Sequence, residues 1–286
     1  MSESAPEQHV ALPEDHPGFS DQAYRRRRAA IAEVGDAYQP GERIPDVEYT
    51  HEEDDVWRTV ASELDKKHDR YACHDYLEGK DRLGLRRDRV PQLQEVSDDL
   101  QRVSGFRIRP VPGLVPTKIF YGSLADRAFM STQYIRHHSV PFYTPEPDII
   151  HELVGHCNSL GNRRFADLYE VAGGAVRRVA DDDDAVEFFS RVWWFTLEFG
   201  VVREGGELRT YGAGLLSSFG EIEEFRNAEV RSWDIGRMGV QDYDITRYQP
   251  LLFAADSMDQ VFDELTGFFA DYDLDSYPRW LKLATA

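Results

Sequence analysis

The stretch Pro145–His156, PEPDIIHELVGH, places two histidines and three carboxylates within twelve residues, between apolar positions. Neutral imidazoles together with carboxylates suit iron, zinc, copper or manganese, whereas calcium and magnesium prefer oxygen ligands. A histidine pair in a helix can also be two ordinary buried side chains with hydrogen-bond partners. The stretch therefore indicates either a transition-metal site, with iron or zinc preferred, or a buried amphipathic helix.

The spacing of the two histidines separates these metals. Zinc hydrolases carry the motif HExxH, in which the histidines are four residues apart on one helical face, whereas this chain has HExxxH from His151 to His156. Five residues at about 100° each leave the two side chains about 140° apart on a regular α-helix. Both can reach one ion only if the helix loosens near Gly155. A zinc hydrolase is therefore the remote alternative.

A third ligand is suggested by Glu198, which lies in the otherwise apolar run Trp193–Gly200, WWFTLEFG. A buried carboxylate without a partner is costly, so either an arginine or a metal ion is expected to neutralise it. Two histidines and one carboxylate, with coordination positions left open, form the facial triad of non-haem Fe(II) oxygenases.

At this point the chain resembles the catalytic domain of the aromatic amino acid hydroxylases. The resemblance rests on six blocks in the family's order: DHPGF (15–19), GFRIRPVPGL (105–114), TQYIRH (132–137), YTPEPDIIHELVGH (143–156), WFTLEFG (194–200) and YGAGLLSSFGE (211–221). It implies a predominantly helical α+β fold with a single catalytic domain over residues 15–286. We expect a disordered tail over residues 1–14, no regulatory domain and no tetramerisation helix, and hence a monomer.

The resemblance also implies the chemistry. Members of the family use Fe(II) and a tetrahydropterin, such as tetrahydrobiopterin, to add one oxygen atom of O2 to an aromatic ring. The similarity is strongest to members that convert L-phenylalanine to L-tyrosine by hydroxylation at ring position 4. Hydroxylation of tryptophan at position 5 is the alternative within the family. A non-catalytic relative would be expected to lack a ligand of the triad, and none is missing.

Each functional residue of the family has a counterpart in this chain. The metal ligands, which we also expect to be the catalytic residues, match His151, His156 and Glu198. The pterin pocket matches Gly113, Leu114, Phe120 and Glu152. The residues around the amino acid substrate match Arg136, Thr144, Pro147, Asp148, Trp194, Ser217 and Ile245. Among these, the resemblance assigns Arg136 to the substrate carboxylate, a role that suits a planar guanidinium group.

Two departures and two pocket positions bear on the activity. Trp193 stands where the family usually has a tyrosine near the iron, and Met130 stands where animal members have a histidine near the pterin. Trp194 occupies a wall where tryptophan hydroxylases have a smaller phenylalanine, which predicts a slot for one benzene ring. Ile245 matches the position of an aspartate in animal tyrosine hydroxylases, so a phenol would find no partner there.

Composition limits the partners and the compartment. The net charge is −19, and only 5 of the 33 basic residues are lysine. Such a surface repels nucleic acid and anionic membranes, and it predicts adaptation to high salt. Cys73 and Cys157 do not imply a disulfide framework. No signal sequence or membrane-spanning run is present, so we expect a cytoplasmic protein that binds small molecules only.

Periodicity predicts several helices and one extended segment. Apolar residues recur at helical spacing over 52–68 and 90–103, and four aspartates at 181–184 precede a third helix that runs through Phe195. A helix over 258–269 is expected to close the chain. The segment 241–250, QDYDITRYQP, is predicted to be extended. The fragment GAG at 212–214 does not complete a dinucleotide-binding motif.

Overall fold

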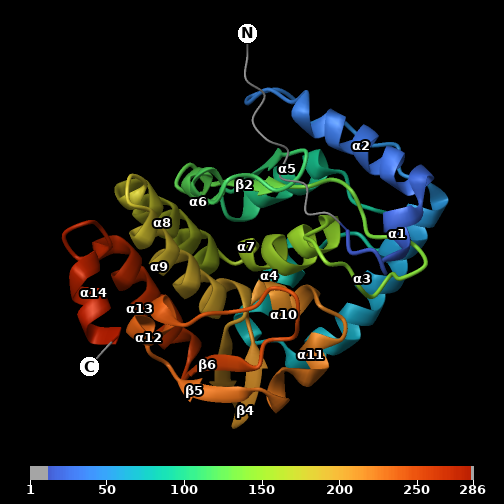
Figure 1. The fold of residues 1–286 in the computed structure, drawn as a ribbon. Helices are drawn as coiled ribbons and strands as arrows, with labels where there is room; N and C mark the ends of the chain where they lie inside the picture. The colour runs from blue at the N-terminus through green and yellow to red at the C-terminus, as the bar shows by residue number, and fades with distance from the viewer. Residues whose placement is uncertain (1–11, 285–286) are drawn as a thin grey trace.

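The computed structural model describes residues 12–284 and is predominantly helical, with a small amount of β-structure (Figure 1). The predicted α+β class is therefore confirmed. Most of the expected tail over residues 1–14 lies outside the described residues. The α-helices are α1 (Pro17–Ser20), α2 (Gln22–Asp36), α3 (His51–Tyr71), α4 (His74–Leu83), α5 (Leu93–Val103), α6 (Thr117–Leu124), α7 (Asn158–Leu160), α8 (Arg163–Val179), α9 (Asp183–Trp193), α10 (Ala213–Ser217), α11 (Glu221–Glu224), α12 (Ile235–Val240), α13 (Met258–Asp271) and α14 (Tyr277–Ala284).

Three further helical segments are not α-helical. Two of them, η1 (His151–Cys157) and η2 (Trp194–Glu198), are π-helices, and η3 (Phe225–Asn227) is a 3₁₀-helix. π-Helices are rare and occur mainly as short insertions in α-helices, often at functional sites. Here each one continues into or out of an α-helix and carries residues of the predicted metal site.

The strands form one small mixed sheet and one isolated pair. The sheet has the order β4-β3-β6-β5, with β3 (Val201–Glu204) antiparallel to β4 (Glu207–Thr210) and parallel to β6 (Leu251–Ala255), which also pairs in parallel with β5 (Glu229–Ser232). The turn between β3 and β4 is Gly205–Gly206, and both glycines have positive φ, as a two-residue type I′ hairpin requires. The pair consists of β1 (Arg107–Pro110) and β2 (Ala128–Ser131), which are parallel.

The periodic segments formed the predicted helices. The helix α3 begins with a capping box in which Thr50 and Glu53 satisfy each other's backbone N–H groups. The helix α9 begins after Asp182, whose side chain accepts a hydrogen bond from the N–H of Ala185, and then passes into η2. The apolar positions of the segments 52–68 and 90–103 are buried, except for Val103, which is half-buried.

Two expectations for the C-terminal part were wrong. Residues 241–250 form turns and irregular backbone, and the strand β6 begins only at Leu251. Nor does the helix over 258–269 close the chain, because α14 follows it and packs against α12. The short apolar stretch after Tyr277 offered too few turns for its helical period to be recognised.

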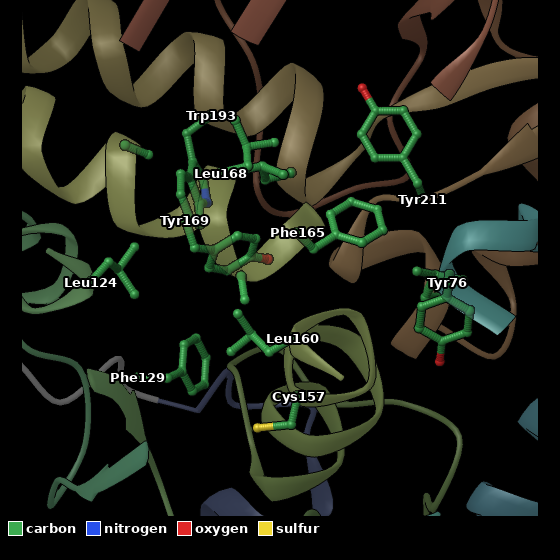
Figure 2. Close-up of a cluster of buried hydrophobic side chains, with 14 of the residues drawn as sticks. Tyr76, Leu124, Phe129, Cys157, Leu160, Phe165, Leu168, Tyr169, Trp193 and Tyr211 are labelled. Carbon is green, nitrogen blue, oxygen red and sulfur yellow. The ribbon is translucent and has the colours of Figure 1, made fainter. Parts of the chain in front are cut away.

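The hydrophobic core lies between the helices and extends beneath the predicted site. Figure 2 shows part of this core, with Tyr76 from α4, Phe165 and Tyr169 from α8, Trp193 from α9, Cys157 at the end of η1 and Leu160 in α7. All of these side chains are buried. The π-helix η1, which carries two of the predicted ligands, thus packs into this core through Leu153, Val154 and Cys157. Within residues 12–284, every helix is too short or too polar to span a membrane.

Candidate active site

The π-helix η1 brings the two histidines of HExxxH together. Its N–H groups bond five residues back, as in the bond from Asn158 N–H to the carbonyl of Leu153. This hydrogen-bond pattern turns residues five apart toward the same side. As a result the Nε2 atoms of His151 and His156 lie 3.1 Å apart. The loosening expected near Gly155 is therefore confirmed.

A side chain from a distant helix supports this π-turn. The carbonyl of Val154, in the middle of η1, accepts hydrogen bonds from Tyr76 OH at 2.8 Å and from Asn158 Nδ2 at 3.2 Å. Buried carbonyl groups need partners when the regular ladder is broken. Tyr76, from α4, therefore compensates for part of the disturbed backbone bonding.

The second π-helix, η2, presents the carboxylate. Its N–H to C=O bond from Phe199 to Trp194, at 2.8 Å, again spans five residues. Glu198 Oε1 lies 3.1 Å from His156 Nε2, and Oε2 lies 3.8 Å from His151 Nε2. One ligand atom from each of the three residues can be chosen so that all lie within 4.8 Å of one another. Trp193 Nε1 donates a hydrogen bond to Glu198 Oε1 at 3.0 Å and holds the carboxylate in place.

Electrostatics keep Glu198 and His151 in forms that bind a metal, whereas the neighbouring carboxylate of Glu198 raises the pKa of His156. Burial alone would raise the pKa of Glu198, but the charge and hydrogen bond of His156, together with His151, hold this pKa at about 2. Burial, with a smaller effect of His156, lowers the pKa of His151 to about 4. A carboxylate and a neutral imidazole are the forms that coordinate a cation. The donor set of two imidazole nitrogens and one carboxylate fits Fe(II).

Each imidazole is also held at its other nitrogen. Ser217 Oγ lies 2.9 Å from His151 Nδ1 and donates to the carbonyl of Ala213 at 2.8 Å. Ser217, predicted to contact the substrate, is thus placed against a metal ligand. Tyr169 OH lies 2.9 Å from His156 Nδ1. Sequence reasoning missed Tyr169, because a tyrosine on the apolar face of a helix is typical of ordinary core.

The predicted pterin residues come from α6, from the loop before it and from η1. Phe120, in α6, contacts the ring of Phe129 edge to face at 5.7 Å, and Phe129 lies 5.0 Å from the ring of His156. Gly113 is half-buried and Leu114 is exposed, both in the loop before α6. Glu152 is buried, and burial raises the pKa of its carboxyl to about 8.

The predicted substrate residues fall into two groups. Arg136 and Asp148 form a buried bidentate ion pair, with Nε to Oδ2 at 2.9 Å and Nη2 to Oδ1 at 2.8 Å. Asp148 Oδ1 also accepts from the N–H of His151 at 3.2 Å, which joins this pair to η1. Nearby, the hydroxyl of Thr144 donates to the carbonyl of Glu146 at 2.9 Å, and Pro147 is half-buried.

The second group surrounds Trp194. The Trp194 ring stacks on Tyr243 with centroids 4.2 Å apart and an interplanar angle of 13°. Trp194 Nε1 donates to Gln249 Oε1 at 3.0 Å. Sequence reasoning also missed Gln249, for which the local pattern held no signal. Ile245 is 67% exposed, so its side chain does not form part of a closed wall.

Comparisons with known proteins agree with this geometry. The family model described as biopterin-dependent aromatic amino acid hydroxylase matches residues 2–276. Phenylalanine 3-hydroxylase of Streptomyces coeruleorubidus is 48% identical over 261 residues, which cover 91% of this chain and 93% of that protein. Phenylalanine-4-hydroxylase of Bos taurus is 42% identical over 265 residues, 91% of this chain but only 58% of the animal protein.

A solved structure gives the same result for the fold. The crystal structure of phenylalanine hydroxylase from Chromobacterium violaceum with bound oxidised Fe(III) superimposes with a TM-score of 0.77 at 30% identity. The match covers 92% of this chain and 93% of that chain.

Proposed function

Because the chain belongs to the biopterin-dependent aromatic amino acid hydroxylases, we propose that it is a monooxygenase that hydroxylates the ring of L-phenylalanine. The observation that carries the proposal is the convergence of ligand atoms from His151, His156 and Glu198 within 4.8 Å. These residues would hold Fe(II) on one side and leave its other positions open. Fe(II) and a tetrahydropterin, when bound, supply the activation of O2 and the electrons.

The protein's own residues bind and orient the reactants. Two N–H groups of the Arg136 guanidinium are taken by Asp148, and the remaining ones would bind the carboxylate of the amino acid. Thr144, Pro147 and Asp148 would surround that end of the substrate. Trp194 would flank the aromatic ring. Asp148 also accepts a hydrogen bond from the N–H of His151. This bond would fix the position of the site for the substrate carboxylate relative to the metal site.

The pterin would lie along Phe120, on the side of the metal centre formed by η1 and the loop before α6. Gly113 and Leu114 would contact it through this loop, and Gly113 leaves room because no atom lies within 4 Å of where a Cβ would be. The ring of Phe120 would stack on the pterin in an offset arrangement. Glu152 would reach the pterin from η1 through water.

The ring position is the point on which the relatives differ. Hydroxylation at position 4, to give L-tyrosine, is the outcome expected from the sequence, and a relative named phenylalanine-4-hydroxylase supports it. The 48% identity to a phenylalanine 3-hydroxylase, over nearly the whole of both chains, favours position 3 as a second candidate. Chromatography of the product against 3- and 4-hydroxyphenylalanine standards would decide between the two.

Selectivity for phenylalanine is proposed to rest on Trp194, because its ring is clamped by Tyr243 and Gln249. The exposed position of Ile245 gives its contribution less support. Trp194→Phe should raise kcat/KM for tryptophan relative to phenylalanine. A wild-type enzyme that prefers tryptophan would support the alternative of tryptophan 5-hydroxylation.

The decisive experiment combines metal analysis with an activity assay. Wild-type protein should bind one Fe(II) per chain and form hydroxyphenylalanine only when Fe(II), tetrahydropterin and O2 are all present. Glu198→Ala should lose iron and activity together. Glu187→Ala, which alters an exposed carboxylate in α9, is the matched control and should retain both. Hydrolysis of a test ester or peptide with Zn²⁺ would point to the zinc hydrolase.

Four wider features belong to the same proposal. A single catalytic domain over residues 15–286 is supported by one buried cluster that includes residues from Ile44 to Tyr272. A cytoplasmic location is supported by the free thiols of Cys73 and Cys157, which fit a reducing compartment, and adaptation to high salt is supported by the net charge of −19. A monomer is proposed as the assembly state, and light scattering at several protein concentrations would test it.

A further inference from the structure

The hydroxyl of Tyr169 is the partner of one metal-binding imidazole. Tyr169 lies in α8, and its side chain is almost completely buried. Its OH is 2.9 Å from Nδ1 of His156. Figure 2 shows its ring next to that of Trp193, and the two centroids are 5.0 Å apart at an interplanar angle of 68°. The phenol therefore has little freedom to turn away from His156.

The arrangement decides which nitrogen of His156 carries the proton. Nε2 is the atom that faces the other ligands, 3.1 Å from His151 Nε2 and 3.1 Å from Glu198 Oε1. A metal ion at this place needs the Nε2 lone pair, so the proton of the neutral ring must be on Nδ1. The oxygen of Tyr169 is then the acceptor for Nδ1–H. A phenylalanine at this position would leave that N–H buried without a partner, which disfavours the tautomer that binds metal.

The same logic holds at His151, with a different hydroxyl. Ser217 Oγ donates to the carbonyl of Ala213 and so offers its lone pair to Nδ1 of His151. The two imidazoles are thus fixed by two hydroxyl groups from different helices, α10 and α8. Contacts of this kind, between the second nitrogen of a ligating histidine and a polar group, orient the ring and set its tautomer.

We propose that Tyr169 is a positioning residue of the metal centre, whose hydroxyl oxygen accepts from Nδ1–H of His156 and fixes the ring in the metal-binding tautomer and orientation. This inference rests on the proposed function only in taking His156 as a metal ligand. Trp193 acts with it. The Trp193 ring packs against Tyr169, and its Nε1 holds Glu198, so this pair of aromatic residues secures two of the three ligands.

The test is a titration of metal-free protein with Co²⁺, followed by its visible absorption and by calorimetry. Tyr169→Phe removes only the hydroxyl group, and we expect the dissociation constant for Co²⁺ to rise by about 10- to 100-fold. Ser217→Ala, the corresponding change at His151, should give an effect of the same size. The Co²⁺ absorption bands of Tyr169→Phe should also shift, because the His156 ring is held less firmly.

Tyr272→Phe is the matched control. Tyr272 is also fully buried and donates its hydroxyl to a backbone carbonyl, that of Ala185, at 2.8 Å. The Tyr272→Phe variant should be less stable than wild type but should bind Co²⁺ with the same affinity. The melting temperature of each metal-free variant shows whether the fold is retained. If Tyr169→Phe binds Co²⁺ as tightly as wild type, or if Tyr272→Phe weakens binding equally, the proposal is overturned.

The Co²⁺ readout is independent of the proposed reaction. A protein that fails to hydroxylate phenylalanine but loses Co²⁺ affinity in Tyr169→Phe would contradict the proposed function and support this inference. An active hydroxylase in which Tyr169→Phe leaves Co²⁺ affinity unchanged would support the proposed function and contradict this inference. A double variant, Tyr169→Phe with Trp193→Phe, should show non-additive losses because the two residues are in contact.

Discussion

The Nε2 atoms of His151 and His156 lie 3.1 Å apart, although a regular α-helix would turn residues at this spacing to different faces. The π-helix η1 accounts for the difference, and it fits into the structure only because Gly155 has no side chain. A Cβ on Gly155 would lie 2.7 Å from the carbonyl oxygen of Ala213 and 3.1 Å from its Cβ. The close contact between η1 and α10 is therefore needed to hold the two histidines in this arrangement.

Gly155→Ala should destabilise the protein by about 1 to 3 kcal/mol, because the added methyl group must push α10 away. Since α10 carries Ser217, metal affinity should fall as well. Urea unfolding and Co²⁺ titration would measure the two effects. Gly267→Ala in α13 is the control, because no atom lies within 4 Å of the added Cβ; it should stabilise by about 0.4 to 1 kcal/mol. Equal stability of both variants would contradict the argument.

Gln249→Leu should loosen the wall of the substrate pocket. Gln249 is buried, accepts from Trp194 Nε1, and donates from Nε2 to the carbonyls of Asp244 and Arg247 at 2.9 and 3.0 Å. Loss of these bonds should cost about 1 to 2 kcal/mol, which corresponds to a change of about 5- to 30-fold in the apparent affinity for the substrate. We expect it in KM for phenylalanine more than in kcat.

Steady-state kinetics with phenylalanine at saturating pterin would measure this effect. Gln101→Leu, which changes an exposed glutamine of α5, is the control and should behave as wild type. A fall in kcat alone, with KM unchanged, would place Gln249 in the chemistry and not in the pocket wall.

Phe120→Leu should weaken pterin binding. Leucine keeps most of the apolar volume between Phe129 and Trp193 but removes the ring, whose stacking contributes about 0.5 to 1.5 kcal/mol. The expected result is a rise of about 2- to 13-fold in KM for the pterin, with KM for phenylalanine little changed. A rise confined to phenylalanine would show that Phe120 belongs to the other site.

Glu221→Gln should flatten the dependence of stability on pH. Burial raises the pKa of the Glu221 carboxyl to about 7, above its ordinary value of 4.5, although the N–H of Gln249 donates to it. Between these two values the folded protein binds more protons than the unfolded chain, so stability falls as pH rises and levels off above about 7. The Glu221 carboxyl makes its full contribution to stability only below about pH 4.5.

Between pH 5 and pH 8, the free energy of unfolding of wild type should fall by on the order of 1 to 3 kcal/mol relative to that of Glu221→Gln. Urea unfolding of both proteins would measure this difference. Gln249 keeps an acceptor in the variant. Glu224→Gln, an exposed position in the same helix, serves as control. Parallel pH profiles for wild type and Glu221→Gln would refute the assignment.

Potassium chloride should raise the melting temperature. The net charge of −19 produces repulsion between carboxylates, and the screening length falls from about 10 Å at 0.1 M salt to about 3 Å at 1 M. The exposed ion pairs lost at the same time contribute little. Thermal unfolding from about 0.1 M to about 2 M KCl would measure the shift. A constant or falling midpoint would rule out adaptation to high salt.

Local sequence determined those parts of this protein that depend on neighbours in the chain. Helices α3 and α5 follow from apolar spacing, and the break in helical geometry near Gly155 follows from the five-residue separation of two expected ligands. The family's motifs identified His151, His156 and Glu198, and the structure brings them together.

Tertiary structure decided the rest, because these contacts join segments far apart in the chain. From the sequence, Tyr169 looked like a core residue and Gln249 like a loop residue. Only the fold brings Tyr169 to His156 and Gln249 to Trp194. Ile245 is exposed in a loop that is held both by local bonds, from the N–H and hydroxyl of Thr246 to Asp244 Oδ1, and by the distant bonds of the Gln249 side chain. Periodicity can predict which face of a helix is buried, but the partner of each buried hydroxyl or amide is selected by the fold.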